Sequence, residues 1–257
     1  MLLPDADAVG DTVAQMVLDR LDATAGSGKP FLLGCPGGRT AASTYQALAR
    51  RSAGGADLSR VVVVMMDEYV VPDGDGGLRR VDPDESYSCL GFGRREILDP
   101  IAAGCREAGT TPPTEVWVPD PADPAAYDAK IEAAGGIDLF LLASGASDGH
   151  IAFNQPGTPR STRTHVTPLG LATRRDNMET FPEFTSLDLV PEHGVSVGVD
   201  TIAGLSHEVV MIVCGEHKQH AFDRLASADV YEPDWPATVA VECKNPTLVA
   251  DSAAAGR

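Results

Sequence analysis

Three continuous apolar runs constrain the fold of this chain more than any other feature of its sequence. They occupy residues 61–66, 139–143 and 209–213 and contain only Val, Leu, Ile, Met, Phe and Ala. Runs this short with no polar residue predict strands buried on both faces, as in a parallel sheet with helices above and below. Segments with helical periodicity lie between them, so strands and helices alternate along the chain.

The remaining elements are predicted from periodicity and from turn residues. Apolar residues recur at helical spacing from Val9 to Leu21, and this helix is expected to end near Gly26. Further helices are predicted at about 41–51, 84–98, 124–134 and 216–225, and further strands at 31–33, 115–118, 163–166, 195–199 and 248–249. This order predicts an α/β fold: a doubly wound, mostly parallel, Rossmann-like sheet with helices on both faces, formed by residues 1–257 as a single domain. The alanine-rich tail after about residue 252 is expected to fray.

The composition is that of an ordinary globular protein, since 43% of the 257 residues are hydrophobic and 5% are aromatic. No stretch approaches the ~20 apolar residues that cross a bilayer, and the N-terminus lacks the basic and apolar regions of a signal peptide. We therefore expect a cytoplasmic protein with no membrane partner. The cysteines are odd in number and never spaced as C-x-x-C, which predicts reduced thiols and no thiolate zinc site. They are Cys35, Cys89, Cys105, Cys214 and Cys243.

The net charge of −17 argues against nucleic acid as a partner, because binding phosphates requires clustered Lys and Arg. The same charge would repel an anionic small molecule over most of the surface. A phosphorylated substrate would therefore need a local cationic pocket. The lysines available to build one are Lys29, Lys130, Lys218 and Lys244.

Asp148 and His150 are the strongest candidates for chemistry. They follow the apolar run 139–143 after the small residues 144–147, at the carboxyl edge of the predicted sheet, where open α/β folds bind ligands. A lone histidine in a loop is usually structural. A carboxylate two residues away, however, can fix the tautomer of the imidazole or favour its protonated form, which favours a functional pair.

Two further loops are expected at the same edge. Gly37, Gly38, Arg39 and Thr40 lie between a strand and a helix, an order that directs backbone N–H groups at an anion, although a glycine loop alone is a weak signal. Asp67 and Glu68 follow the run 61–66. One of them is expected to tether the loop, and a partly desolvated carboxylate there has a raised pKa and suits a base for a carbon-bound proton. Lys218, after the run 209–213, is a candidate phosphate contact.

Short motifs in a specific order, spread over most of the chain, carry a resemblance to a known family. They lie at residues 33–40, 44–45, 66–70, 85–87, 137–140, 148–154, 195–199, 201–202 and 215–218. The chain strongly resembles the glucosamine-6-phosphate deaminase family, which is related in fold to the 6-phosphogluconolactonases. Lactonases share the glycine loop and Asp-Gly-His but not Met-Asp-Glu-Tyr at 66–69, so the resemblance favours the deaminase branch.

The resemblance implies a role for each candidate residue. Asp67 would move a proton between C2 and C1 of the opened sugar, and His150, oriented by Asp148, would assist ring opening. The glycine loop and Lys218 would hold the phosphate of a sugar-phosphate substrate. The implied enzyme is a hydrolase/isomerase that releases a ketose phosphate and ammonia without a metal, nicotinamide or other cofactor.

Departures from the family pattern leave the substrate open. At residue 155 the family has a glutamate, which completes its catalytic set. This chain has Gln155 there, which is predicted to take the same place and can form hydrogen bonds but cannot exchange a proton. A phosphate-binding arginine of the family corresponds to Glu179, and Arg39, Arg174 or Arg175 would have to compensate. The basic pair of the family's effector site corresponds to His165 and Thr167, so regulation of that kind is expected to be absent.

The leading hypothesis is therefore a deaminating aldose–ketose isomerase acting on a 2-amino-2-deoxyhexose 6-phosphate. One alternative is a related sugar-phosphate isomerase, or a 6-phosphogluconolactonase-like hydrolase, acting on a different substrate. Another is a catalytically weakened protein that binds a sugar phosphate without converting it. The sequence leaves both a monomer and a homo-oligomer open.

Overall fold

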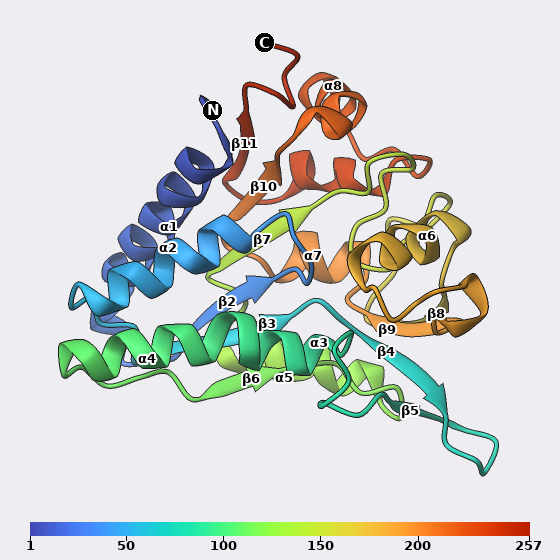
Figure 1. Ribbon diagram of the computed structural model, residues 1–257, viewed down its shortest axis with the longest axis horizontal. Coiled ribbons are helices and arrows are strands. Elements are labelled where there is room, and N and C mark those ends of the chain that lie inside the picture. The colour runs from blue at the N-terminus through green and yellow to red at the C-terminus, as the bar shows by residue number, and fades with distance from the viewer.

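A seven-stranded parallel sheet forms the centre of the computed structural model, which describes all residues from Met1 to Arg257 (Figure 1). Its strand order is β1-β11-β10-β7-β2-β3-β6, and every neighbouring pair is parallel. The strands are β1 (Leu2–Leu3), β2 (Phe31–Cys35), β3 (Val61–Met65), β6 (Glu115–Trp117), β7 (Leu139–Ala143), β10 (Val209–Val213) and β11 (Pro246–Asp251). The three apolar runs are thus confirmed as buried parallel strands.

Helices cover both faces of this sheet, which confirms the predicted doubly wound α/β fold. One core lies beneath α1 (Ala6–Ala23), α2 (Ala42–Ala53) and α4 (Asp99–Ala108). The other lies beneath α5 (Pro124–Ala134), α7 (Val199–Leu205) and α8 (Gln219–Ser227). Because side chains of a strand alternate between its faces, Leu33 packs in the first core and Leu32 in the second. Both residues are fully buried.

A second sheet, with four antiparallel strands in the order β5-β4-β9-β8, was not predicted. Its strands are β4 (Asp67–Pro72), β5 (Leu78–Arg80), β8 (His165–Pro168) and β9 (His193–Ser196). The segments predicted as strands at 163–166 and 195–199 therefore belong mainly here and not to the parallel sheet. The chain passes from β3 into β4 within two residues, so Asp67 lies where the two sheets meet, rather than in the predicted loop.

Several helix boundaries also differ from the prediction. The helix expected from residue 84 begins instead with α3 (Cys89–Phe92), because Ser88 caps it by accepting a hydrogen bond from Gly91 N. It continues through a π-helical stretch, Gly93–Leu98, into α4. Two helices were missed, α6 (Leu171–Thr180) and α7. α6 is mostly polar and offers no apolar periodicity. Its N-cap is Gly170, which makes no side-chain cap.

The C-terminal tail is folded rather than frayed. Ala254 is fully buried, and its N–H donates to Asp251 Oδ1 at 2.7 Å. Arg257 N donates to the Ser252 carbonyl at 2.9 Å. The tail therefore closes as a capped turn against the second core, an arrangement that its alanine-rich composition did not indicate.

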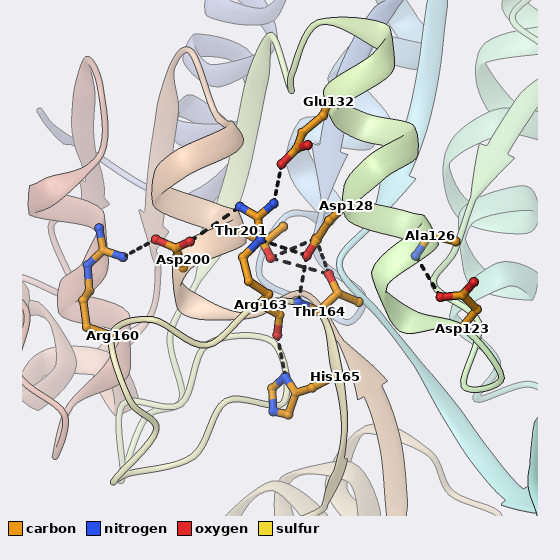
Figure 2. Close-up of polar contacts among 10 residues, drawn as sticks. All are labelled: Asp123, Ala126, Asp128, Glu132, Arg160, Arg163, Thr164, His165, Asp200 and Thr201. Carbon is orange, nitrogen blue, oxygen red and sulfur yellow. Dashed lines mark hydrogen bonds and ion pairs between the residues drawn. The ribbon is translucent and has the colours of Figure 1, made fainter.

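A buried carboxylate joins α5 to the segment before β8 and to α7 (Figure 2). Asp128 accepts hydrogen bonds from Thr164 N and Oγ1 at 3.1 and 2.5 Å and from Thr201 Oγ1 at 2.9 Å, and it pairs with Arg163 Nε at 3.2 Å. Arg163 also pairs with Glu132. Because all its acceptor sites are used, this buried charge ties the second sheet to the helices beside it.

Candidate active site

A cavity of about 760 Å³ opens at the carboxyl ends of the central parallel strands. Four post-strand segments line it: residues 36–40 after β2, Asp67 after β3, residues 144–147 with His150 after β7, and Cys214, His217 and Lys218 after β10. Parallel strands bring their carboxyl ends to one edge of a sheet, which is why segments so distant in sequence meet here. The structure thus brings Asp67 and His150 to one cavity.

Asp67 is a nearly dry carboxylate, with 6% of its surface exposed. The structure gives its carboxyl one hydrogen bond, from Cys89 Sγ to Oδ1 at 3.2 Å. Burial raises the pKa of Asp67 to about 7, and the charge of Glu68 adds to the rise, whereas the hydrogen bond from Cys89 and the charge of His150 lower it. The group can therefore both take up and release a proton near neutral pH.

The adjacent Glu68 is a structural anchor and does not line the cavity. Its Oε1 accepts from the N–H groups of Tyr69 and Cys89 at 2.8 and 2.9 Å. Its Oε2 accepts from Ser88 Oγ and Leu90 N at 3.0 and 2.8 Å. Of the two acidic residues, Glu68 tethers the chain at the start of α3 and Asp67 faces the cavity.

Asp148 and His150 form a close pair. Asp148 Oδ1 lies 2.7 Å from His150 Nδ1 and also accepts from His150 N at 3.1 Å. Burial alone would raise the pKa of Asp148, but the hydrogen bonds and charge of His150 outweigh burial and lower it. Between them, Gly149 has a φ of 66°, and a Cβ there would lie 2.3 Å from the indole of Trp235. Trp235 thus supports the loop from behind.

The cationic end of the cavity consists of the glycine loop and Lys218. The predicted residues all line it: Gly37, Gly38, Arg39, Thr40 and Lys218. Lys218 Nζ donates to the Ser144 carbonyl at 2.5 Å. Burial lowers the pKa of Lys218, as does Arg39, while the charges of Asp176 and Asp148 act in the opposite direction. A partly desolvated ammonium beside backbone N–H groups suits an anion such as phosphate.

Gln155 does not line the cavity, so the structure does not bring it to the other candidates. Its side-chain amide donates to the carbonyl of Pro168. The turn after Asn154 directs residue 155 toward the end of β8, and the catalytic role of Gln155 stays a prediction from the resemblance. Asn154 itself is buried and donates to the carbonyls of Ile151 and Val197 at 2.9 and 2.8 Å.

The α6 helix contributes an acidic wall. Glu179 and Asp176 both line the cavity. Burial raises the pKa of Asp176, the charges of His150 and Lys218 lower it, and those of Asp148 and Glu179 raise it. Arg39 is the one compensating arginine at the cavity; Arg174 Nη2 donates instead to the carbonyls of Leu187 and Val190 at 2.6 and 3.1 Å, and Arg175 is exposed.

Several polar cavity residues were not identified from the sequence, among them Cys89, Thr173, Asp176 and Asn177. Thr173 Oγ1 and Asn177 Nδ2 are buried without a hydrogen-bond partner. Buried polar atoms are normally paired, so these two are available to a ligand. Their spacing of four residues places them on one face of a helix, a signal that required α6 to be predicted first.

No group of three or more His, Cys, Asp or Glu side chains is arranged to hold a metal ion. None of the helices is long and apolar enough to cross a membrane.

Comparisons with known proteins agree over nearly the whole chain. Residues 4–249 match the family described as glucosamine-6-phosphate isomerases/6-phosphogluconolactonase. A glucosamine-6-phosphate deaminase of Streptomyces avermitilis is 34% identical over 258 residues, covering 100% of this chain and 91% of that protein. A solved monomeric glucosamine-6-phosphate deaminase has a TM-score of 0.81 at 23% identity, covering 100% and 98% of the two chains. The solved 6-phosphogluconolactonase of Trypanosoma brucei has a TM-score of 0.68 at 18% identity, covering 100% of this chain and 97% of that chain.

Proposed function

This chain belongs to the glucosamine-6-phosphate isomerase and 6-phosphogluconolactonase family, and from its cavity we propose that it deaminates and isomerises a 2-amino-2-deoxyhexose 6-phosphate such as glucosamine 6-phosphate. The products are a ketose phosphate and ammonia. The observation that carries the proposal is the position of Asp67: a desolvated carboxylate whose pKa is raised to about 7 lines the same cavity as His150, which Asp148 holds through its Nδ1.

Ring opening is assigned to His150. Asp148 accepts the Nδ1 proton of the imidazole and leaves Nε2 to exchange a proton with the ring oxygen and the anomeric hydroxyl of the sugar. Asp148 also stabilises the imidazolium formed in the exchange, because its lowered pKa keeps it ionised.

Asp67 then acts as the base. It removes the proton from C2 to give an enolamine and returns it to C1, while, in net balance, O1 gains a proton and the amino nitrogen loses one. The result is a C1 alcohol and a C2 imine. Water adds to the imine carbon and ammonia leaves, so the C2 ketone forms with no net oxidation. The transfers of ring opening are assigned to His150 and the transfer from C2 to C1 to Asp67.

The phosphate is assigned to residues 37–40 and Lys218, at the cationic end of the cavity. The acidic wall of α6 supports an amino sugar over a sugar acid as the substrate. Asp176 and Glu179 attract the ammonium group of an amino sugar and repel the carboxylate of a sugar acid.

The test is turnover of glucosamine 6-phosphate, measured as ammonia and fructose 6-phosphate in equal amounts, in buffer containing a chelator. Asp67→Asn is the matched control, because it keeps size and the hydrogen bond from Cys89 but not basicity. No release of ammonia above that control rejects the deaminase. 6-Phosphogluconolactone is assayed in parallel, and hydrolysis of the lactone without deamination assigns the protein to the other branch of the family.

A further inference from the structure

The carboxyl group of Asp67 is held differently from that of its neighbour. Glu68 accepts four hydrogen bonds, whereas Asp67 accepts one, from the thiol of Cys89 at 3.2 Å. Only Oδ1 of Asp67 is engaged in this way. The thiol therefore restrains one oxygen and leaves the other free toward the cavity.

The position of Cys89 is itself fixed. Its N–H donates to Glu68 Oε1 at 2.9 Å, and the flanking Ser88 Oγ and Leu90 N donate to Glu68 Oε2. Cys89 is 6% exposed and lines the cavity. Glu68 thus fixes the position of the Cys89 backbone, and from there the thiol reaches Asp67. Cys89 therefore connects the two adjacent carboxylates.

The thiol is a permanent donor in this setting. Burial raises the pKa of Cys89 well above its ordinary value, and the charges of Asp67 and Glu68 raise it further. Sulfur is only a weak acceptor, so the thiol is a poor partner for the carboxyl O–H of protonated Asp67. Cys89 therefore stabilises the carboxylate of Asp67 more than its protonated form.

We propose that Cys89 is a positioning residue for Asp67, its S–H group orienting the carboxylate toward the substrate and favouring the ionised form that removes the C2 proton. The role of the orientation rests on the proposed function, but the hydrogen bond and its effect on ionisation do not. Asp67 is surrounded by other ionisable groups, which must stay constant in the test. They are Glu68 and Tyr69 on β4, Tyr45 on α2, Tyr127 on α5 and His150.

The three tyrosines remain neutral up to high pH, because burial raises the pKa of each well above 10. Titration of Asp67 can therefore be followed through the carbonyl ¹³C resonance of labelled aspartate, assigned by its loss in Asp67→Asn. Removing one hydrogen bond of ordinary strength should raise the titration midpoint by roughly half to one pH unit.

Four variants separate the hydrogen bond from packing. Cys89→Ala removes the donor and leaves space, Cys89→Val removes the donor and fills the space, and Cys89→Ser retains a donor. Cys243→Ala truncates another buried thiol that does not line the cavity. The Ala and Val variants should both show the upward shift, Ser should stay near the wild-type midpoint, and Cys243→Ala should match the wild type.

Activity provides the second measurement. In the Ala and Val variants the acid limb of kcat/KM should move up with the Asp67 midpoint, so the rate falls several-fold at pH 6 and recovers at high pH. An equal loss at every pH, or an unmoved Asp67 resonance in both variants, overturns the proposal. If the wild type proves inactive on amino sugars, the ¹³C titration still decides whether Cys89 controls Asp67, independently of the proposed function.

Discussion

Asp148 Oδ1 accepts hydrogen bonds from both the ring Nδ1 and the backbone N of His150, at 2.7 and 3.1 Å. The loop closes on itself through this double contact, which fixes the imidazole before any substrate binds. Asp148→Asn would present an amide to Nδ1 and favour the wrong tautomer, so we expect kcat to fall by about 10²-fold or more with little change in fold. Steady-state kinetics measure the loss. A variant within threefold of wild type would show that the pair does not orient the catalytic imidazole.

Asp67→Asn should remove turnover and stabilise the protein at high pH. The pKa of Asp67 in the folded protein is about 7, above its ordinary 3.8, so the stability linked to its protonation is complete below pH 3.8 and lost as the pH rises through 7. The variant avoids this loss. We expect a rate reduction of about 10²- to 10⁴-fold, and a gain of up to about 4 kcal/mol at pH 8 that shrinks toward pH 4. Denaturant unfolding at both pH values measures it; equal gains at both would contradict burial of the charge.

Lys218→Ala should weaken binding of the substrate more than it slows the chemistry. The ammonium lies at the cationic end of the cavity beside Arg39, and a hydrogen bond to a charged group contributes about 1.5–3 kcal/mol. We expect KM for glucosamine 6-phosphate to rise about 10- to 100-fold, and inhibition by inorganic phosphate to weaken in parallel. Lys244→Ala, away from the cavity, is the control. An unchanged phosphate inhibition constant would place the phosphate elsewhere.

Gln155→Glu should not restore activity, although the family has glutamate at this position. The side-chain amide donates to the Pro168 carbonyl, and a carboxylate there would face that carbonyl without a proton to give. We expect a loss of about 1–2 kcal/mol in the free energy of unfolding and no increase in kcat. A faster variant, measured by ammonia release, would mean that residue 155 reaches the substrate.

Asp128→Ala should be strongly destabilising and leave the cavity chemistry intact. It removes the acceptor that Thr164, Thr201 and Arg163 share (Figure 2), and each buried threonine hydroxyl left without a partner costs about 1–3 kcal/mol. Asp123→Ala on the same helix is the matched control. It removes only an N-cap bond to Ala126 N and should cost about 1 kcal/mol. Similar losses for the two variants would argue against the network.

The central sheet could be predicted because local pattern and tertiary role coincide there. A strand such as β10, buried on both faces, has to be apolar throughout, and its bounds were predicted correctly. The second sheet could not, because its two halves, β5–β4 and β9–β8, are joined only by the antiparallel pairing of β4 with β9, residues as distant in sequence as Glu68 and Val195. A strand that begins with two acidic residues has no apolar signature, and the groups that accommodate Glu68, at residues 88–90, are known only from the tertiary structure.

The sequence by itself determined the alternation of strands and helices, and with it the edge at which Asp67, His150 and Lys218 had to meet, since the direction of parallel strands sets which of their ends share a rim. Only the tertiary structure decided which groups face the cavity. It placed the side chain of Asp67 at the cavity and those of Glu68 and Gln155 outside it. It also brought Cys89 and the acidic face of α6 to the cavity wall. These outcomes depend on packing between distant segments, which local pattern does not encode.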